Sequence, residues 1–382
     1  MADIGYNDNV KVAGRKFHIQ TASNINKGYA RCEVFEAGRV ITTHHTSFER
    51  RGDSNSELLE RRIRKIVEDL HQETKVEIEL MFQIAEKIKK LKHAPSNVKV
   101  GLMFLQNNLI KDAIEQFEIA INLDPKSIIA IKHLAVCYIK EERIDEAIEL
   151  LEKAIEEDSK FADIHFNLGK AYFFKRQYEK AIRHFNEALK LNPQYYAASY
   201  HLAMTYLDSI VHSADNSLLP PSTVRFQRSQ QLLEHLYSQD LYKFTGIYPQ
   251  ILKALNEKKI AAAVKILNNN QDVVFPLNVL GLIGIDFYLK FMYGGKNLDA
   301  DVVKKYEEKL VEASKTHPNY ADIWNNLGIV HLIQCRNLFL QALTEFDKAL
   351  EINPSFNKAL KNKKLVENDG KEFLILLRAI LR

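Results

Sequence analysis

Three histidines near the start of the chain are candidate ligands for a metal ion. His44 and His45 are adjacent within an expected strand, so their side chains would point to opposite faces and could not chelate one ion. His18, in a neighbouring expected strand, could join one of them. Two ligands do not make a zinc site, and we expect an exposed polar strand face here, with no metal bound.

A glycine pair followed by lysine, Gly294-Gly295-Lys296, is the segment closest to a phosphate-binding loop. Such a loop needs a further glycine upstream, at a fixed distance, and a serine or threonine directly after the lysine. Both are missing. The sequence therefore predicts no nucleotide site and no cofactor.

Catalysis by a nucleophile would need a serine or cysteine paired with a base. His133, His165 and His201 fall in successive segments of similar pattern, but no nucleophile is paired with them at a recognisable spacing. Cys137 lies four residues after His133, and we expect it to be a buried structural cysteine. The chain is therefore predicted not to be an enzyme.

Composition predicts a folded chain with a large core. The 382 residues are 46% hydrophobic and 27% charged, with nine prolines and fourteen glycines. The 53 basic and 49 acidic residues give a net charge of +4, too even a balance to predict nucleic acid or an anionic membrane as the partner.

Location is predicted from what the first residues and the cysteines lack. The N-terminus has no apolar segment of a signal peptide, and three scattered cysteines make no disulfide framework, so we expect a cytoplasmic protein. The most apolar stretch, 273–293, contains Asp286 and Lys290, which cost ~2.5–3.5 kcal/mol each in mid-bilayer. We expect a buried helix there and no membrane insertion.

Small and large apolar residues recur at an interval of 34 residues. Small residues are needed where two helices cross closely, and large ones fill the space between neighbouring helix pairs. Pro125 and Pro193, two periods apart, would end second helices. The recurring positions are Ala113, Ala147 and Ala181; Ala120, Ala154 and Ala188; Leu134, Leu168 and Leu202; and Tyr138, Tyr172 and Tyr206.

This pattern resembles the tetratricopeptide repeat (TPR) family. Residues 161–193 carry Leu168-Gly169, Tyr172, Ala181, Phe185, Ala188 and Pro193 at the family spacing, with His165 in place of the usual tryptophan. Weaker copies occupy 94–127 and 128–161, and another begins at Trp324. In that last copy Leu327-Gly328 lies two residues farther from Ala342 than the pattern asks, so we expect a longer turn between its helices. The resemblance implies a mostly α, right-handed TPR-type solenoid.

The residues before the repeats predict a small antiparallel β-meander and a helix. Segments 15–22, 29–36 and 39–48 are rich in β-branched and aromatic residues, and Gly38 suits a hairpin turn. From 54 to 92 an apolar stripe at helical spacing is interrupted between Leu70 and Leu80. The helix either covers the first repeat or forms a dimerising coiled coil, and the interruption favours the first. This portion is similar to the N-terminal portion of uncharacterised bacterial TPR proteins.

Five regions follow from these patterns. We predict a β-meander over 1–52, an amphipathic helical linker over 53–93 and a TPR block over 94–210. Degenerate helical repeats with an inserted loop at 212–222 follow over 211–320, and a TPR with capping helices closes the chain over 321–382.

The expected function is non-enzymatic protein binding in the concave groove that TPR first helices form. Two matches out of five to the carboxylate clamp of chaperone-tail receptors, Lys132 and Asn167, argue against that ligand and favour a peptide with apolar side chains. The alternatives are self-assembly into a homo-oligomer through the N-terminal segment and a role as the regulatory subunit of an enzyme complex. The predicted groove residues are Lys132, His133 and Val136; Phe166, Asn167, Lys170 and Phe174; and Tyr200, His201 and Met204.

Overall fold

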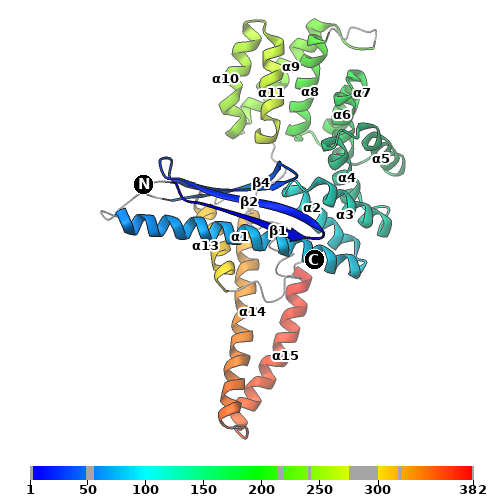
Figure 1. Ribbon diagram of the computed structural model, residues 1–382. Coiled ribbons are helices and arrows are strands. Elements are labelled where there is room, and N and C mark those ends of the chain that lie inside the picture. Colours follow the sequence, from blue (N-terminus) through cyan, green and yellow to red (C-terminus); the bar gives the residue numbers. More distant parts are fainter. Residues whose placement is uncertain are drawn as a thin grey trace. The chain divides into compact units, whose positions relative to one another are not determined.

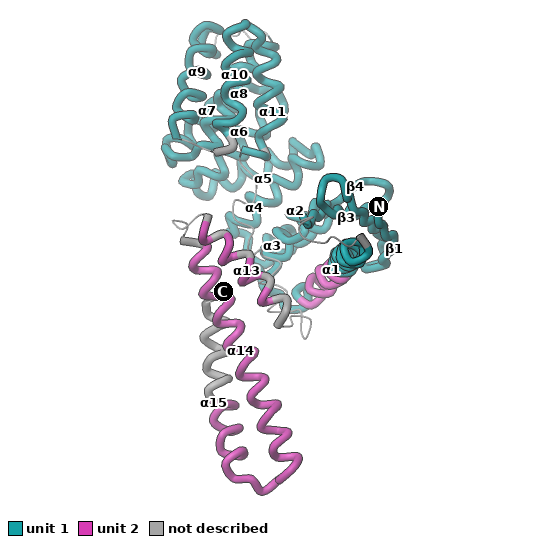
Figure 2. Tube along the Cα trace, turned by 90° about the vertical axis from the view of Figure 1, so that its left-hand side faces the viewer, with its two compact units in different colours: residues 1–75, 88–279 teal, residues 76–87, 280–382 magenta. Residues whose placement is uncertain are grey.

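The computed structural model describes residues 3–48, 56–212, 218–239, 242–274, 300–316 and 321–380. The chain divides into two compact units, one of residues 1–75 and 88–279 and the other of residues 76–87 and 280–382 (Figure 2). It is a mostly α fold, with a helical solenoid and a small antiparallel sheet at the N-terminus.

The N-terminal sheet is a meander of four strands in the order β1-β2-β3-β4. The sequence predicted three, and the strand it missed is β1, whose alternation is weak because Asn7, Asp8 and Asn9 are polar. Tight turns with positive φ at Gly14 and Gly38 close the first and last hairpins, which confirms the expectation for Gly38. The strands are β1 Gly5–Val12, β2 Arg15–Asn24, β3 Tyr29–Glu36 and β4 Arg39–Ser47.

Helix α1, Ser56–Leu91, runs along one face of this sheet (Figure 1). Ile63 and Val67 are 1% and 0% exposed and pack in one cluster with Ile4 and Ala30 of the N-terminal segment. Burial of this apolar face against the sheet is what holds the helix, since a meander of this size is marginal alone.

The interruption in the apolar stripe of α1 is filled by polar residues that have hydrogen-bond partners on the sheet, for His71, or within the helix, for Thr74. His71 and Thr74 are buried on the same face. The Nδ1 atom of His71 lies 2.8 Å from the hydroxyl oxygen of Thr21, and that hydroxyl also lies 2.9 Å from the Cys32 sulfur. The helix is therefore continuous, and its packing face does not break where the hydrophobic pattern does.

Two ion pairs connect the N-terminal segment to α3, Ile110–Leu123. The Arg15 guanidinium binds Asp112 at 2.5 and 2.6 Å and Glu36 at 2.5 and 2.7 Å, and Lys89 binds Glu115 at 2.8 Å. These contacts support the arrangement in which the N-terminal segment packs onto the first repeat.

The repeat array begins with α2 and stacks helix pairs in chain order. The period of 34 matches the structure, because the alanines at 113, 147 and 181 are all 0% exposed. Asn108, Glu142 and Arg176 take positive φ in the turns between the two helices of each pair. The helices are α2 Ala94–Gln106, α3, α4 Ile128–Lys140, α5 Ile144–Glu157, α6 Ala162–Phe174, α7 Tyr178–Leu191 and α8 Tyr196–Val211.

Three further helices pack after α8: α9 Ser222–Ser238, α10 Tyr242–Asn256 and α11 Ile260–Val274. Phe244, Ile251 and Leu267 of α10 and α11 are fully buried in a cluster with residues of α8. Residues 213–217 of the predicted 212–222 loop and residues 275–293 of the apolar stretch lie outside the described residues. Among the helices that the structure describes, none has the length and apolar character that a membrane span requires.

The second unit contains α13 Ala300–Thr316, α14 Ala321–Ile352 and α15 Asn357–Ile380. The predicted long turn before Ala342 is wrong, because α14 is one continuous helix of 32 residues. α15 lies within the region 321–382, where capping helices were predicted. Ile323, Val330 and Ile333 of α14 are buried, at 0 to 1% exposure.

Candidate functional site

A charged network crosses the first helices of three successive repeats. Asp163, in the first turn of α6, accepts a bond from Lys132 of α4 at 2.8 Å and one from the Tyr195 hydroxyl, before α8, at 2.7 Å. Burial acts to raise the pKa of Asp163, but the bonds from Lys132 and Tyr195 prevail and hold it below its ordinary value. The carboxylate therefore stays charged and fixes the spacing of the three helices.

An aromatic group lies beside this network on α6. The Phe166 ring is half-buried, with its centroid 4.9 Å from that of Tyr195, and the Lys170 ammonium lies 5.8 Å from it. Phe174, at the end of the same helix, is 48% exposed. On α4, Ile129 is 55% exposed at the position equivalent to Asp163. These side chains give the first helices a surface with both apolar and cationic groups.

Tyr200 and Met204 do not lie in a groove, which corrects their predicted role. They are 0% and 1% exposed, because the helices after α8 cover the side of α8 that was expected to be open. The Tyr200 hydroxyl donates to the carbonyl of Leu267 at 2.6 Å, and burial raises its pKa. The sequence patterns of α10 and α11 were too degenerate for this cover to be predicted.

His201, at 4% exposure, is also a core residue and not a groove residue, and His133 is partly buried against the preceding helix. Each ring stacks on a phenylalanine of the preceding second helix, His133 on Phe117 at 5.7 Å and His201 on Phe185 at 5.9 Å. Burial lowers the pKa of His133 to about 4 and that of His201 well below its ordinary value. Both rings are neutral at pH 7 and take part in repeat packing.

Asn167 occupies the same position in the repeat between them and is 4% exposed. Its amide donates to the backbone carbonyl of Asp163 at 2.8 Å. Lys132 is engaged by the Asp163 carboxylate. Both residues that matched the carboxylate clamp thus already have partners within the array. Val136, on α4, is half-buried.

Two neighbouring histidines lie between α6 and α7. His165, in the place of the family tryptophan, has its Nδ1 atom 3.1 Å from Nδ1 of His184, and its Nε2 atom 3.1 Å from the carbonyl oxygen of Ser159. Burial and the neighbouring His165 lower the pKa of His184 to about 4. Nε2 of His165 must donate to that carbonyl, and one of the two Nδ1 atoms must donate to the other.

The contacts of His71 have the order of a hydrolytic triad. Besides its 2.8 Å contact with the Thr21 hydroxyl, its Nε2 atom lies 3.5 Å from the Asp8 carboxylate. Thr21 and Cys32 are 1% and 0% exposed, however, and burial raises the pKa of the Cys32 thiol. A substrate has no access to these groups, and their contacts hold α1 on the sheet.

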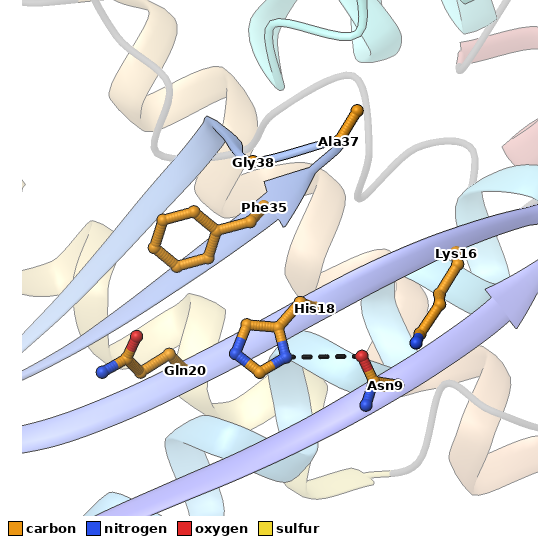
Figure 3. Close-up of a pocket in the computed structure, with 7 residues that line it drawn as sticks. All are labelled: Asn9, Lys16, His18, Gln20, Phe35, Ala37 and Gly38. Carbon is orange, nitrogen blue, oxygen red and sulfur yellow. Dashed lines mark hydrogen bonds between the residues drawn. The ribbon is translucent and has the colours of Figure 1, made fainter.

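The outer face of the sheet carries a shallow hollow of about 330 Å³ (Figure 3). His18 lies there, with Nδ1 3.4 Å from the side-chain oxygen of Asn9 and its ring 6.0 Å from Phe35. The other candidate histidines lie on β4, and β3 separates that strand from β2, so they are not brought together with His18. Within the described ranges, no three metal-ligating side chains form a cluster that could hold an ion.

The repeat segment matches two family models, tetratricopeptide repeat over residues 162–195 and TPR repeat over residues 137–175. Residues 137–195 carry tetratricopeptide repeats. No curated protein matches the chain.

Several solved TPR structures are similar to parts of the chain. A crystal structure of MamA is 20% identical, with a TM-score of 0.35, and the match covers 43% of this chain and 94% of that one. MamA residues 41 to the end from Desulfovibrio magneticus RS-1 are 18% identical, with a TM-score of 0.36 and coverages of 50% and 98%. YrrB, described as a TPR protein with an unusual peptide-binding site, is 16% identical, with a TM-score of 0.33 and coverages of 52% and 95%.

Proposed function

We propose that this chain is a non-enzymatic scaffold that binds a peptide segment of a partner protein along the first helices α4 and α6. The observation that carries the proposal is the exposure of apolar side chains on those helices, beside a charged network that fixes their spacing. Ile129 and Phe174 are 55% and 48% exposed, although both belong to well-formed repeats. Exposed aromatic residues on a rigid surface are common anchors of binding energy.

The chemistry of the surface favours a partner with apolar side chains. The charge of Lys132 is already balanced by Asp163, so it does not provide a site for a free carboxylate. Phe166 and Phe174, on one helix, offer contact to apolar groups, with Lys170 near the Phe166 ring. An extended or helical segment that presents apolar side chains at intervals suits this arrangement.

The test is selection from a displayed library of random peptides on the full chain, followed by affinity measurement with the best peptide. Replacing Phe166 or Phe174 with alanine should weaken its binding by more than ~1 kcal/mol, about fivefold in Kd. Leu191→Ala is the matched control, because Leu191 is 41% exposed on the second helix α7. Circular dichroism checks that each variant stays helical.

Two results would reject the proposal. In one, the selected peptides bind the Phe166→Ala, Phe174→Ala double variant as tightly as the unmodified chain. In the other, Leu191→Ala weakens binding as much as the groove variants do, which would place the interface on the second helices.

A further inference from the structure

The last strand of the sheet, β4, has an edge that no other strand covers within the described part of the chain, where β4 pairs with β3 alone. The edge strand on the other side, β1, carries the charged residues Asp8 and Lys11, which discourage a further strand from pairing. From Val40 to Ser47, β4 contains no aspartate, glutamate, lysine or arginine and is rich in threonine. Addition of a strand is therefore better tolerated at β4 than at β1.

The pairing with β3 determines where the backbone groups of β4 point. In an antiparallel pair every second residue exchanges hydrogen bonds with the neighbouring strand, and the residues between them direct N–H and C=O outward. The Phe48 amide donates to the Gly28 carbonyl at 2.9 Å, in continuation of the β3–β4 register. Counted back from Phe48, Thr46 to Thr42 face β3 at the even positions. The residues that direct their backbone groups to the open edge are Thr43, His45 and Ser47.

A bulge marks the end of this regular stretch. Val34 is opposite Thr42 and Phe35 is opposite Val40, so Ile41 is an extra residue of β4. Beyond the bulge, Val40 is 45% exposed. An added strand could therefore pair regularly along residues 42–47, and its continuation would pass Val40.

A cleft of about 900 Å³ opens at that end of β4. Val40 and Ile41 line it from the strand, and Asn108 and Leu109 line it from the turn between α2 and α3. Three further cations in its wall come from different elements, the first residue of β4, the first turn of α3 and the last turn of α4. These are Arg39, Lys111 and Lys140.

The charges in the cleft are not balanced by its own residues. Arg15 is engaged by Glu36 and Asp112. Within the described ranges the other three cations form no ion pair, although Lys111 joins Arg15 from farther away in lowering the pKa of Glu36. The one other carboxylate in the wall is the exposed Glu141. The cleft therefore favours an anionic group.

We propose that an extended segment of a partner protein adds to β4 as a fifth strand and places acidic side chains in this cleft. The added strand runs antiparallel to β4, as each strand of the sheet runs to its neighbour, so its C-terminal end lies at the cleft. Backbone hydrogen bonds to the open edge supply affinity, and bonds from Arg39, Lys111 and Lys140 to carboxylates supply specificity.

A second copy of this chain fits the edge less well than an acidic segment. β4 contains no carboxylate, so pairing of two β4 strands would leave the three cations without partners. Asp8, on the other edge strand, is held by Lys75 at 2.8 Å. The edge is also distinct from the peptide groove on α4 and α6, because none of the residues predicted for that groove lines the cleft.

The probe is a short peptide that ends in a run of glutamates, selected from a displayed library with the preceding residues randomised. Selection uses the full chain with Phe166→Ala and Phe174→Ala, so that the groove on α4 and α6 is not the target. The best peptide is synthesised with a fluorescent label, and anisotropy with the unmodified chain gives Kd. A selection that yields no binder would overturn the proposal.

Methylation of the peptide backbone tests strand addition directly. Methyl groups on alternate amide nitrogens remove the donors on one side of an extended peptide at a time. One of the two alternate series should abolish binding and the other should leave it unchanged. Equal effects of the two series would overturn the proposal, and this result does not depend on the folding of any variant.

Thr43→Pro is the matching change in the protein. It removes an N–H that points to the open edge and no hydrogen bond to β3, a position where edge strands tolerate proline. Kd should rise by about threefold to tenfold, the effect of losing one hydrogen bond. Asn7→Pro is the matched control on β1. Counted from the bond that the Ser23 amide donates to the Ile4 carbonyl at 2.8 Å, the N–H of Asn7 also points away from the sheet.

The cleft is tested by charge removal. Arg39→Gln with Lys140→Gln should raise Kd roughly fourfold and reduce its dependence on salt concentration. Lys153→Gln with Lys160→Gln makes the same change in net charge at exposed positions elsewhere and should have no effect. Equal losses in the two double variants would overturn the assignment of the acidic side chains to the cleft.

Circular dichroism and thermal unfolding check that each variant folds. Unchanged binding to a folded Thr43→Pro variant would overturn the proposal, as would an equal loss in Asn7→Pro. Light scattering tests the other occupant: if the unmodified chain had twice its 44.1 kDa mass and Thr43→Pro made it a monomer, a second copy would occupy the edge in place of an acidic segment.

Discussion

Gly169 lies so close to Phe185 that a Cβ atom on it would come within 2.7 Å of the ring. We expect Gly169→Ala to destabilise the array by ~1–3 kcal/mol through overpacking, although alanine is the better helix former. Urea unfolding followed by circular dichroism measures the effect. Gly246→Ala, in open space on α10, should be neutral or stabilise by up to ~1 kcal/mol, and equal effects of the two changes would disprove the assigned contact.

Acid should destabilise the array because partly buried histidines must take up protons. The pKa values of His133 and His184 are lowered from 6.5 to about 4, mainly by burial. Between these values the unfolded chain binds more protons than the folded one. The contribution of the neutral rings to the free energy of unfolding is thus fully present above about pH 6.5 and is lost as pH falls toward 4.

Urea midpoints measured across that pH range test this expectation. His133→Phe keeps an aromatic ring against Phe117 but removes one titrating group, so its stability should fall less steeply with acid. The same slope in the variant and the unmodified chain would exclude His133 as a contributor.

Arg15 should contribute to stability through the two carboxylates it holds. Asp112 has a side-chain exposure of 15%, and its burial raises its pKa more than Arg15 lowers it. Arg15→Met would leave that carboxyl without its cation, which we expect to cost ~1–3 kcal/mol of unfolding free energy, less than a fully buried pair would. In an Asp112→Asn background the same change should cost clearly less, and a double-mutant cycle with no coupling would argue against the pair.

Removal of residues 1–93 should make the remaining chain prone to aggregate. The truncation takes away Arg15 and Lys89, which bind α3, and uncovers the part of α2 and α3 that they adjoin. Light scattering of the truncated chain measures the outcome. If it were instead a well-behaved monomer while the intact chain is a dimer, self-association would have to be assigned to the N-terminal segment.

The sequence predicted the elements that have a regular hydrophobic period. It missed those that form only because a neighbouring element pairs or packs with them. The alanines at 113, 147 and 181 gave the helix pairs correctly because close helix crossings tolerate only small side chains. Strand β1 was missed because its polar residues weaken the alternation, although pairing with β2 supplies its hydrogen bonds. The Leu327-Gly328 motif is not followed by a turn, because helix propensity in the segment after it prevails over the repeat pattern and α14 continues.

The candidate site was predicted in part, for a similar reason. The expectation that first helices carry exposed apolar groups holds for Phe174 but fails for Tyr200, which later helices cover. Asp163, at the start of α6, and Tyr195, just before α8, were not predicted as site residues, although they precede Phe166 and Tyr200 in those two repeats. The periodic positions of a repeat indicate which residues face the concave side, but only packing determines which of them are accessible.

The stacking of His133 on Phe117 and of His201 on Phe185 also bears on how such an array can change in length. The repeat between these layers has Leu151 and Asn167 in the equivalent positions, so the packing chemistry alternates and recurs every 68 residues. Loss of one 34-residue repeat, 128–161, would set Asn167 against Phe117, whereas loss of 128–195 would bring His201 there and restore the stack. Gain or loss of repeats in pairs is therefore the change that this core tolerates best.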